Sequence, residues 1–265
     1  MTRIARVLAV AGSDSGGGAG IQADLKTYAA FGVYGMTAVT ATTAQNTRGV
    51  LRVGPVAPEL VAAQMRAVMD DLGVDAIKIG MLPSAGIMRA VAAILAEIPG
   101  VPVVLDPVMR SSSGQALMDP EAEDVFREAV MPLATVLTPN ILEAAQLTGF
   151  PVADRVDMRR AARALAHQGI PAVVVKGGHL PGAMAADLLW QDGQEHWFEA
   201  ARIATPHTHG TGCTFASAIA ACLAQGMDLV AAVPKAKAYV VGAMVSAPGF
   251  GAGAGPLWHQ WEAPR

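Results

Sequence analysis

One stretch near the C-terminal end combines the residue types that phosphate chemistry needs. Residues 205–220 read TPHTHGTGCTFASAIA, so Gly210 and Gly212 stand directly before a run of helix-forming residues. Glycines let the backbone turn sharply, and the first four N–H groups of a helix have no partner within the helix. We therefore predict that Gly210, Thr211 and Gly212 form a cradle of N–H donors for a phosphate or a developing oxyanion.

Cys213 stands at the mouth of this predicted cradle. A thiol at a helix N-terminus is expected to have a lowered pKa, which makes it a candidate base or nucleophile near neutral pH. A glycine-rich turn that simply starts a helix, with Cys213 as a small buried side chain, explains the local sequence equally well.

Polar residues also follow three expected strands. Asp106 ends an apolar strand, Asn140 and Glu143 open a helix three residues apart, and Lys176 ends another strand. Asp106, Asn140 and Glu143 offer the hard oxygen atoms that Mg²⁺ uses beside a phosphate. Asn140 and Glu143 fit a helix capping box as well, and the two roles are compatible. Phosphoryl transfer needs little beyond such positioning and charge neutralisation, to which Lys176 can contribute.

Two further segments point to a ligand. Residues 12–20 read GSDSGGGAG, which is neither a Walker A loop nor a G-x-G-x-x-G fingerprint. Its glycines predict either a close approach of the backbone to a ligand or a mobile flap. Residues 40–47 are polar, and Gln45 offers the donor and acceptor that match an aminopyrimidine edge, although a solvated loop is the alternative. Met81 fits either the core or the wall of a ring-binding site.

Short β-branched strands alternate with alanine-rich helices, which predicts a mostly parallel sheet covered by helices on both faces. We expect strands at Ile4–Ala11, Gly35–Thr40, Ala76–Ile79, Val103–Asp106, Val136–Thr138 and Ala172–Lys176. Asp192-Gly193 predicts a hairpin between Ala186–Trp190 and Gln194–Ala200 at a sheet edge. We expect helices at Ile21–Phe31, Glu59–Asp71, Ala85–Ala96, Glu121–Met131, Ile141–Leu147, Met158–Gln168, Thr214–Ala224 and Leu229–Ser246. Ligands of such sheets collect at the carboxyl ends of the strands, where the polar residues fall.

The composition excludes several classes of protein. The chain has 265 residues, 52% of them hydrophobic, which is enough for a large single core. Its formal net charge of -3 lacks the excess of positive charge that nucleic-acid-binding proteins carry. We find no apolar run long enough for a membrane span and no signal peptide, so a cytoplasmic protein is expected. No linker or repeat divides residues 1–265, which predicts a single domain. His207 and His209 lack partners at metal-ligand spacing, so no zinc site is expected.

The motifs resemble the ribokinase-like superfamily, and within it the hydroxymethylpyrimidine/phosphomethylpyrimidine kinases of thiamine biosynthesis. The resemblance runs in order through nearly the whole chain, in the segments at 11–27, 44–49, 78–82, 105–109, 137–140, 175–179 and 208–214. It implies a three-layer α/β/α sandwich and a kinase that converts 4-amino-5-hydroxymethyl-2-methylpyrimidine to its monophosphate and then to its diphosphate.

The resemblance also implies roles for individual residues. The pyrimidine would be surrounded by Gly12, Ala19, Asp24, Thr43, Gln45, Met81 and Val108, with Gln45 reading its amino edge. ATP would be bound by Lys176, Thr208, Asn140 and the amides of residues 210–213. Asp106 and Glu143, with Asn140, would serve Mg²⁺, and Cys213 would be the catalytic base. Two departures are Gly16, where serine is common, and Ser111-Ser112-Ser113, which replaces a loop that often contains lysine.

Other functions compete with this one. A pyridoxal or pyridoxine kinase uses the same chemistry on a different flat ring. Gln45 with Met81 favours the pyrimidine, but the sequence does not exclude activity on pyridoxal. A sugar or nucleoside kinase fits Cys213 and the Gln45 segment poorly, and an NAD-dependent oxidoreductase lacks its fingerprint. A non-catalytic binding protein is disfavoured by the intact set of Asp106, Glu143, Lys176 and Cys213. A homodimer is expected by resemblance alone.

Overall fold

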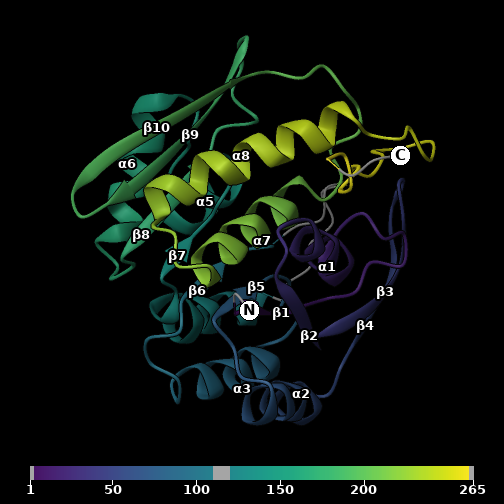
Figure 1. Cartoon of the computed structure of the whole chain (residues 1–265). Helices are drawn as coiled ribbons and strands as arrows, with labels where there is room; N and C mark the ends of the chain where they lie inside the picture. Colours follow the sequence, from purple (N-terminus) through teal and green to yellow (C-terminus); the bar gives the residue numbers. More distant parts are fainter. Residues whose placement is uncertain (1–2, 110–119, 263–265) are drawn as a thin grey trace.

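The main sheet is mixed and mostly parallel, as predicted (Figure 1). The computed structural model describes residues 3–109 and 120–262, and in this part eight strands form the sheet in the order β10-β9-β8-β7-β6-β5-β1-β2. The strands β1, β2, β5, β6, β7 and β8 are mutually parallel, while β9 runs antiparallel to β8 and β10. Their bounds are β1 Arg6–Ala11, β2 Tyr34–Val39, β5 Ala76–Ile79, β6 Val103–Leu105, β7 Val136–Leu137, β8 Ala172–Lys176, β9 Met184–Gln191 and β10 Gln194–Ala201.

Helices cover both faces of this sheet and complete three layers (Figure 1). One face packs against α1 (Gly20–Ala30), α7 (Thr211–Ala224) and α8 (Leu229–Val245). The other packs against α2 (Pro58–Asp71), α3 (Ala85–Leu95), α5 (Ile141–Thr148) and α6 (Arg155–Ala166). Each face has its own hydrophobic core, because the central strands carry β-branched and alanine side chains that are buried on both sides.

The predicted antiparallel edge is confirmed. Strands β9 and β10 pair in register from Gln191–Gln194 to Met184–Ala201. The turn between them uses left-handed backbone at both central residues, with φ of 51° at Asp192 and 76° at Gly193. Such backbone matches the twist of the two strands, and aspartate and glycine adopt it at low cost.

Two expectations need correction. Residues 40–47 were treated as a polar continuation of a strand or a solvated loop, but β3 (Ala41–Asn46) and β4 (Gly49–Pro55) form a separate two-stranded antiparallel sheet. The segment carries no apolar alternation, because this hairpin projects from the main sheet instead of lying within it (Figure 1). Its threonines favour extended backbone.

The helix predicted at Glu121–Met131 is the second correction. It begins as α4 (Pro120–Val125), continues as the π-helix η1 (Phe126–Val130) and ends as the 3-10 helix η2 (Met131–Leu133). Pro132 has no N–H to continue an α-helical ladder, which accounts for the end of the helix there.

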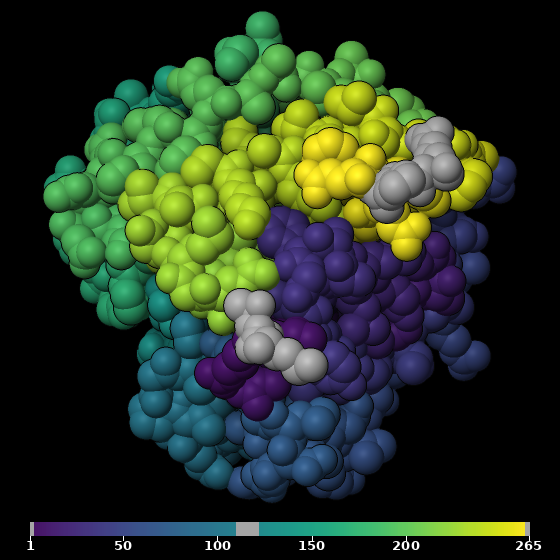
Figure 2. Space-filling view, in the orientation of Figure 1, coloured from purple at the N-terminus to yellow at the C-terminus, as the bar shows by residue number. Residues whose placement is uncertain are grey.

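The C-terminal segment returns to the beginning of the chain. On the face shown in Figure 2, the yellow C-terminal residues and α8 lie next to the purple N-terminal part. The backbone of His209 pairs with Pro256, and the Gly253 N–H donates to Thr47 Oγ1 at 3.3 Å. No helix in the described part of the chain is long and apolar enough to cross a membrane.

Candidate active site

A cavity of about 810 Å³ opens at the carboxyl ends of the parallel strands. Every residue to which the sequence analysis gave a catalytic, substrate, nucleotide or metal role lines it, except Asp24. We call one side of it the transfer end, formed by Asp106, Asn140, Glu143, Lys176 and residues 210–213. The other side is the ring end, formed by Gly12, Ala19, Thr43, Gln45, Met81 and Val108.

The start of α7 requires glycine at position 210. Gly210, the N-cap, has a φ of +87°, and a β-carbon there would lie 1.8 Å from the carbonyl oxygen of Gly18. A β-carbon on Gly212 would lie 3.4 Å from Lys176 Nζ and 3.5 Å from Asp106 Oδ2. Gly210 therefore lets the helix N-terminus approach the glycine-rich loop, and Gly212 places the first turn of α7 beside the charged cluster at the positive end of the helix.

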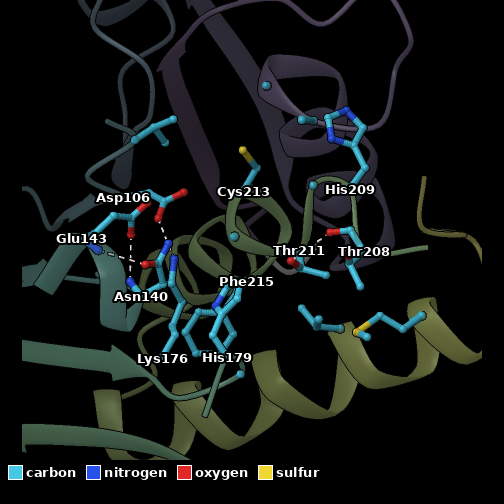
Figure 3. A pocket seen from close by; sticks show the side chains of 18 of the residues that line it. Asp106, Asn140, Glu143, Lys176, His179, Thr208, His209, Thr211, Cys213 and Phe215 are labelled. Carbon is cyan, nitrogen blue, oxygen red and sulfur yellow. Dashed lines mark hydrogen bonds and ion pairs between the residues drawn. The ribbon is translucent and has the colours of Figure 1, made fainter. Parts of the chain in front are cut away.

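Asp106 and Lys176 form the charged centre of the transfer end (Figure 3). Lys176 Nζ donates to Asp106 Oδ1 at 2.8 Å, and both side chains are largely buried. Burial alone would lower the pKa of Lys176, but Asp106 and Glu143 outweigh it and raise that pKa. The lysine thus stays charged beside the α7 N-terminus, where a transferred phosphoryl group needs compensating charge.

Asn140 and Glu143 form the capping box of α5. Asn140 Oδ1 accepts from the Leu142 and Glu143 N–H groups, and Glu143 Oε2 accepts from the Asn140 N–H at 2.7 Å. Burial and the nearby Asp106 raise the pKa of Glu143 to about 7, against the effect of Lys176. The capping role does not exclude the predicted ligand role, because a carboxylate has several lone pairs to offer.

Cys213 lies in the cavity between the charged cluster and His209 (Figure 3), but its predicted acidity is wrong. Burial, together with the carboxylates of Asp24 and Asp106, raises the pKa of its thiol to about 11, although Lys78 and a backbone hydrogen bond act to lower it. The desolvation of the thiol outweighs the helix dipole that motivated the prediction. In the ligand-free protein the thiol is therefore protonated at neutral pH.

Asp24 stands behind the cavity wall instead of on it. Its carboxylate is fully buried and accepts from Lys78 Nζ at 2.9 and 3.0 Å and from Ser217 Oγ at 2.6 Å. Lys78 does line the cavity. Asp24 thus reaches the site through Lys78, a residue whose motif the sequence analysis noted without giving the lysine a role.

The ring end combines apolar side chains with polar groups. The Met81 side chain packs against Gly12, where a β-carbon would lie 2.4 Å from Met81 Cε. Thr43 Oγ1 donates to the Ser13 carbonyl oxygen at 2.8 Å, and the Gln45 side chain lies beside it. This arrangement suits a planar ring with one hydrogen-bonding edge.

Sequence reasoning missed two residues of this end, Asp14 and His209. His209 Nε2 lies 2.9 Å from Asp14 Oδ2, and both side chains are buried. His209 was considered only as a possible zinc ligand, and within the described residues no cluster of three or more histidine, cysteine, aspartate or glutamate side chains can hold a metal ion. The available signal was its position directly before Gly210 in the phosphate-binding motif.

A second missed pair supports the transfer end. Lys237 Nζ on α8 donates to Asp187 Oδ2 at 2.6 Å, and Asp187 Oδ1 accepts from the Gly177 N–H at 2.9 Å. Because Gly177 follows Lys176, this pair fixes the backbone that carries the lysine. Ser111-Ser112-Ser113, the loop that departs from the family pattern, lies outside the described residues.

Comparison with known proteins identifies the family of the chain. The family model described as Phosphomethylpyrimidine kinase matches residues 14–258. A hydroxymethylpyrimidine/phosphomethylpyrimidine kinase of Streptomyces coelicolor is 51% identical over 255 residues, which cover 96% of this chain and 94% of that protein.

Two solved structures share the fold. The ADP complex of Bacillus subtilis pyridoxal kinase has a TM-score of 0.92 and 38% identity, covering 99% of this chain and 100% of that one. A phosphomethylpyrimidine kinase of Clostridium difficile has a TM-score of 0.80 and 40% identity, and the match covers 89% of this chain and 98% of that one. The chain therefore belongs to the phosphomethylpyrimidine kinase family, and the expected family, fold and enzyme class are confirmed.

Proposed function

From its membership in the phosphomethylpyrimidine kinase family, we propose that this chain uses ATP to phosphorylate 4-amino-5-hydroxymethyl-2-methylpyrimidine and then its monophosphate, for thiamine biosynthesis. The observation that carries the proposal is one cavity with two complementary ends: a helix N-terminus with a lysine–aspartate pair, and a group of apolar residues with a glutamine beside them. The first end suits a phosphoryl group and the second suits an aminopyrimidine.

The ring end binds the pyrimidine in this proposal. Met81 and Val108 pack on the ring, Gly12 and Ala19 let the backbone approach it, and Gln45 with Thr43 pairs with its polar edge. Asp24 holds Lys78 in place from behind. Lys176, Thr208, Asn140 and the amides of residues 210–213 bind the phosphates of ATP.

In the first reaction, the hydroxymethyl oxygen attacks the γ-phosphorus in line, a new O–P bond forms and the bond to the ADP oxygen breaks. The hydroxyl proton must leave the attacking oxygen, and Cys213 is the group we assign to accept it as the thiolate. Because the thiol of the ligand-free protein is protonated at neutral pH, this role requires that the thiol lose its own proton before the hydroxyl attacks. Lys78 favours the thiolate, since its charge lowers the pKa of Cys213. The N-terminus of α7 and Lys176 stabilise the charge of the transferred group.

The transfer end also fits Mg²⁺. Asp106 and Glu143 place two carboxylates beside one lysine, and the missing β-carbon of Gly212 leaves room next to Asp106 Oδ2. Mg²⁺ in phosphoryl-transfer sites is held by one or two carboxylates together with substrate phosphates, so this donor set is sufficient. When bound, Mg²⁺ would supply positive charge to the transferring phosphates.

The second phosphorylation does not need Cys213 as a general base. The nucleophile is then a phosphate oxygen, whose second pKa is about 6, so it is ionised at neutral pH without a base. Both reactions use the same transfer end.

We further propose that residues 1–265 form one ribokinase-like domain, that the chain is a homodimer, and that it acts in the cytoplasm on small molecules and not on nucleic acid or membranes. The acidic net charge of -3 supports the last point. Sedimentation equilibrium of the purified chain tests the dimer, and a monomer across the micromolar range would contradict it.

Phosphorus NMR tests the reaction. Purified protein with MgATP and the hydroxymethylpyrimidine is expected to give the monophosphate and then the diphosphate. If only the monophosphate accumulates, the chain does not catalyse the second phosphorylation. If no product forms, the proposed function is wrong.

A pyridoxal kinase is the second candidate, because the Bacillus subtilis pyridoxal kinase has the same fold at 38% identity. The same experiment with pyridoxal decides between them. A higher kcat/KM for pyridoxal than for the pyrimidine would move the assignment to vitamin B6 salvage and leave the transfer end unchanged.

A further inference from the structure

Three residues that are far apart in the sequence meet at the ring end: Asp14 of the glycine-rich loop, Gln45 of β3 and His209 before α7. His209 Nε2 lies 2.9 Å from Asp14 Oδ2 and 3.3 Å from the Gln45 side-chain amide. Figure 3 shows the His209 ring on the opposite side of Cys213 from Asp106 and Lys176. The role of this group depends on the protons that each partner carries.

Asp14 can only accept hydrogen bonds in this site. Its Oδ1 accepts from the Gly16 N–H at 2.8 Å, and its Oδ2 accepts from the N–H groups of Gly18 at 2.9 Å and Ala19 at 2.8 Å. Burial alone would raise the pKa of Asp14, but the hydrogen bonds from His209 and from these backbone groups outweigh it and lower the pKa. A carboxylate beside His209 Nε2 requires a proton on that nitrogen, so Nε2–H donates to Asp14.

Gln45 contacts three residues, one through its backbone and two through its side-chain amide. Its backbone is held by Ser15, whose Oγ accepts from the Gln45 N–H and donates to the Gln45 carbonyl oxygen, both at 2.8 Å. Its side-chain Oε1 and Nε2 lie 3.3 Å from Thr43 Oγ1 and from His209 Nε2, respectively. Rotation by about 180° about the Cγ–Cδ bond exchanges the two amide atoms, and the protons of the neighbours decide between the two orientations.

Both neighbours favour the same orientation. Thr43 has one hydroxyl proton, which it donates to the Ser13 carbonyl oxygen at 2.8 Å, so it is free to accept from an amide N–H. His209 Nε2 carries its proton and cannot accept. With its NH₂ group facing Thr43, the amide donates to the Thr43 hydroxyl, and its oxygen faces the Nε2–H of His209. That N–H already donates to Asp14 and reaches the amide oxygen only as the longer branch of a three-centre bond, whereas the opposite orientation would set the NH₂ group against the same N–H.

We propose that Asp14 and His209 are positioning residues that fix the orientation of the Gln45 amide and so set which hydrogen-bonding edge of a heterocycle the ring end accepts. This rests on the proposed function, because it assumes that Gln45 reads the substrate ring. When the Asp14–His209 pair (the dyad) is intact, the Gln45 side chain is already ordered before the substrate binds. Its amide oxygen then lies on the His209 side and its NH₂ group lies on the Thr43 side. Without His209, the substrate has to order the amide as it binds.

The first test is independent of turnover. The ¹⁵N chemical shifts of the imidazoles are measured on the ligand-free protein labelled at histidine, and His209 is assigned by its loss in His209→Gln. We expect Nε2 to be protonated. An unprotonated Nε2 would let Gln45 donate to His209 and would overturn the proposal even if the enzyme is fully active.

The second test separates ring recognition from catalysis. In His209→Leu the KM for the hydroxymethylpyrimidine is expected to rise about threefold to tenfold, the range set by immobilising one side chain, while kcat and the KM for ATP change by less than about twofold. The preference for the pyrimidine over pyridoxal falls by the same factor. His209→Gln, which keeps an N–H donor near the Nε2 position, restores most of the KM.

The matched control is His167→Leu at the exposed C-cap of α6, which is expected to change neither constant. An equal loss of kcat for both rings with unchanged KM would show a different role for His209 and overturn the proposal. If the unmodified protein does not phosphorylate the pyrimidine, the proposed function fails, whereas the histidine shifts still report on the dyad.

Discussion

The transfer end and the ring end of the cavity are built from different kinds of structure. Asp106 and Lys176 sit at the ends of buried central strands, and Gly212 sits in the first turn of a buried helix. The ring end depends on the projecting β3–β4 hairpin and the glycine-rich loop, which are joined by side-chain hydrogen bonds. The transfer end is thus held by the core, whereas much of the ring end is held by contacts between a hairpin and a loop.

Removing Cys213 tests whether the transfer end treats its two acceptors differently. In Cys213→Ala the rate of the first phosphorylation is expected to fall by about 10²- to 10⁴-fold, the usual contribution of a general base, and the second rate by less than about tenfold. Single-turnover measurements with each acceptor give the two rates. Equal losses would show that Cys213 does not act through the hydroxyl proton.

Removing Lys176 affects both acceptors alike. We expect Lys176→Met to lower kcat for both steps by about 10²- to 10³-fold, since it removes a charge aimed at the transferred group, with little change in the KM for the pyrimidine. Steady-state kinetics measure this, and Lys235→Met, on the exposed face of α8, is the control. A large rise in the pyrimidine KM would mean that the two ends are not separate.

The C-terminal segment supports the transfer end through His259. Burial and the nearby Lys26 lower the pKa of His259 to about 4, and its Nε2 lies 2.9 Å from Thr214 Oγ1, next to Cys213. The folded pKa lies below the unfolded value of about 6.5, so the unfolded chain binds the proton first. The free energy of unfolding is then expected to fall by about 3 kcal/mol as the pH falls from 6.5 to 4.

Urea unfolding at several pH values measures this loss. In His259→Gln the free energy of unfolding is expected to fall less between pH 6.5 and pH 4, because the contribution of His259 is absent. A free energy of unfolding that stays constant between pH 7 and pH 5 in the unmodified protein would contradict the prediction.

The smallest expected effect is at the ring end. In Gln45→Leu we expect kcat/KM for the pyrimidine to fall about tenfold, through KM, because one hydrogen-bonded edge is lost, while ATP binding is unchanged. The ratio of kcat/KM values for pyrimidine and pyridoxal is the measurement. A loss confined to kcat would place Gln45 in the transfer machinery instead.

The same contrast accounts for what the sequence predicts well. Asp106, Lys176 and Gly210–Cys213 follow recognisable strand and helix patterns, so periodicity alone locates them at one edge of the sheet. Asp14 and His209 are separated by 195 positions, and only the folded chain brings them together. The acidity of Cys213 was mispredicted because burial depends on packing from other segments, which a helix start does not reveal.

The placement of α7 and α8 has a consequence for synthesis on the ribosome. These last two helices complete the core on one face of the sheet, and α7 also carries the Gly-Thr-Gly-Cys turn. A nascent chain that ends before residue 209 thus lacks both the phosphate cradle and two of the three helices that cover one face of its sheet. In such a fragment the apolar residues that α7 and α8 bury would face water, so we expect the sheet to complete its core only after both helices have left the ribosome.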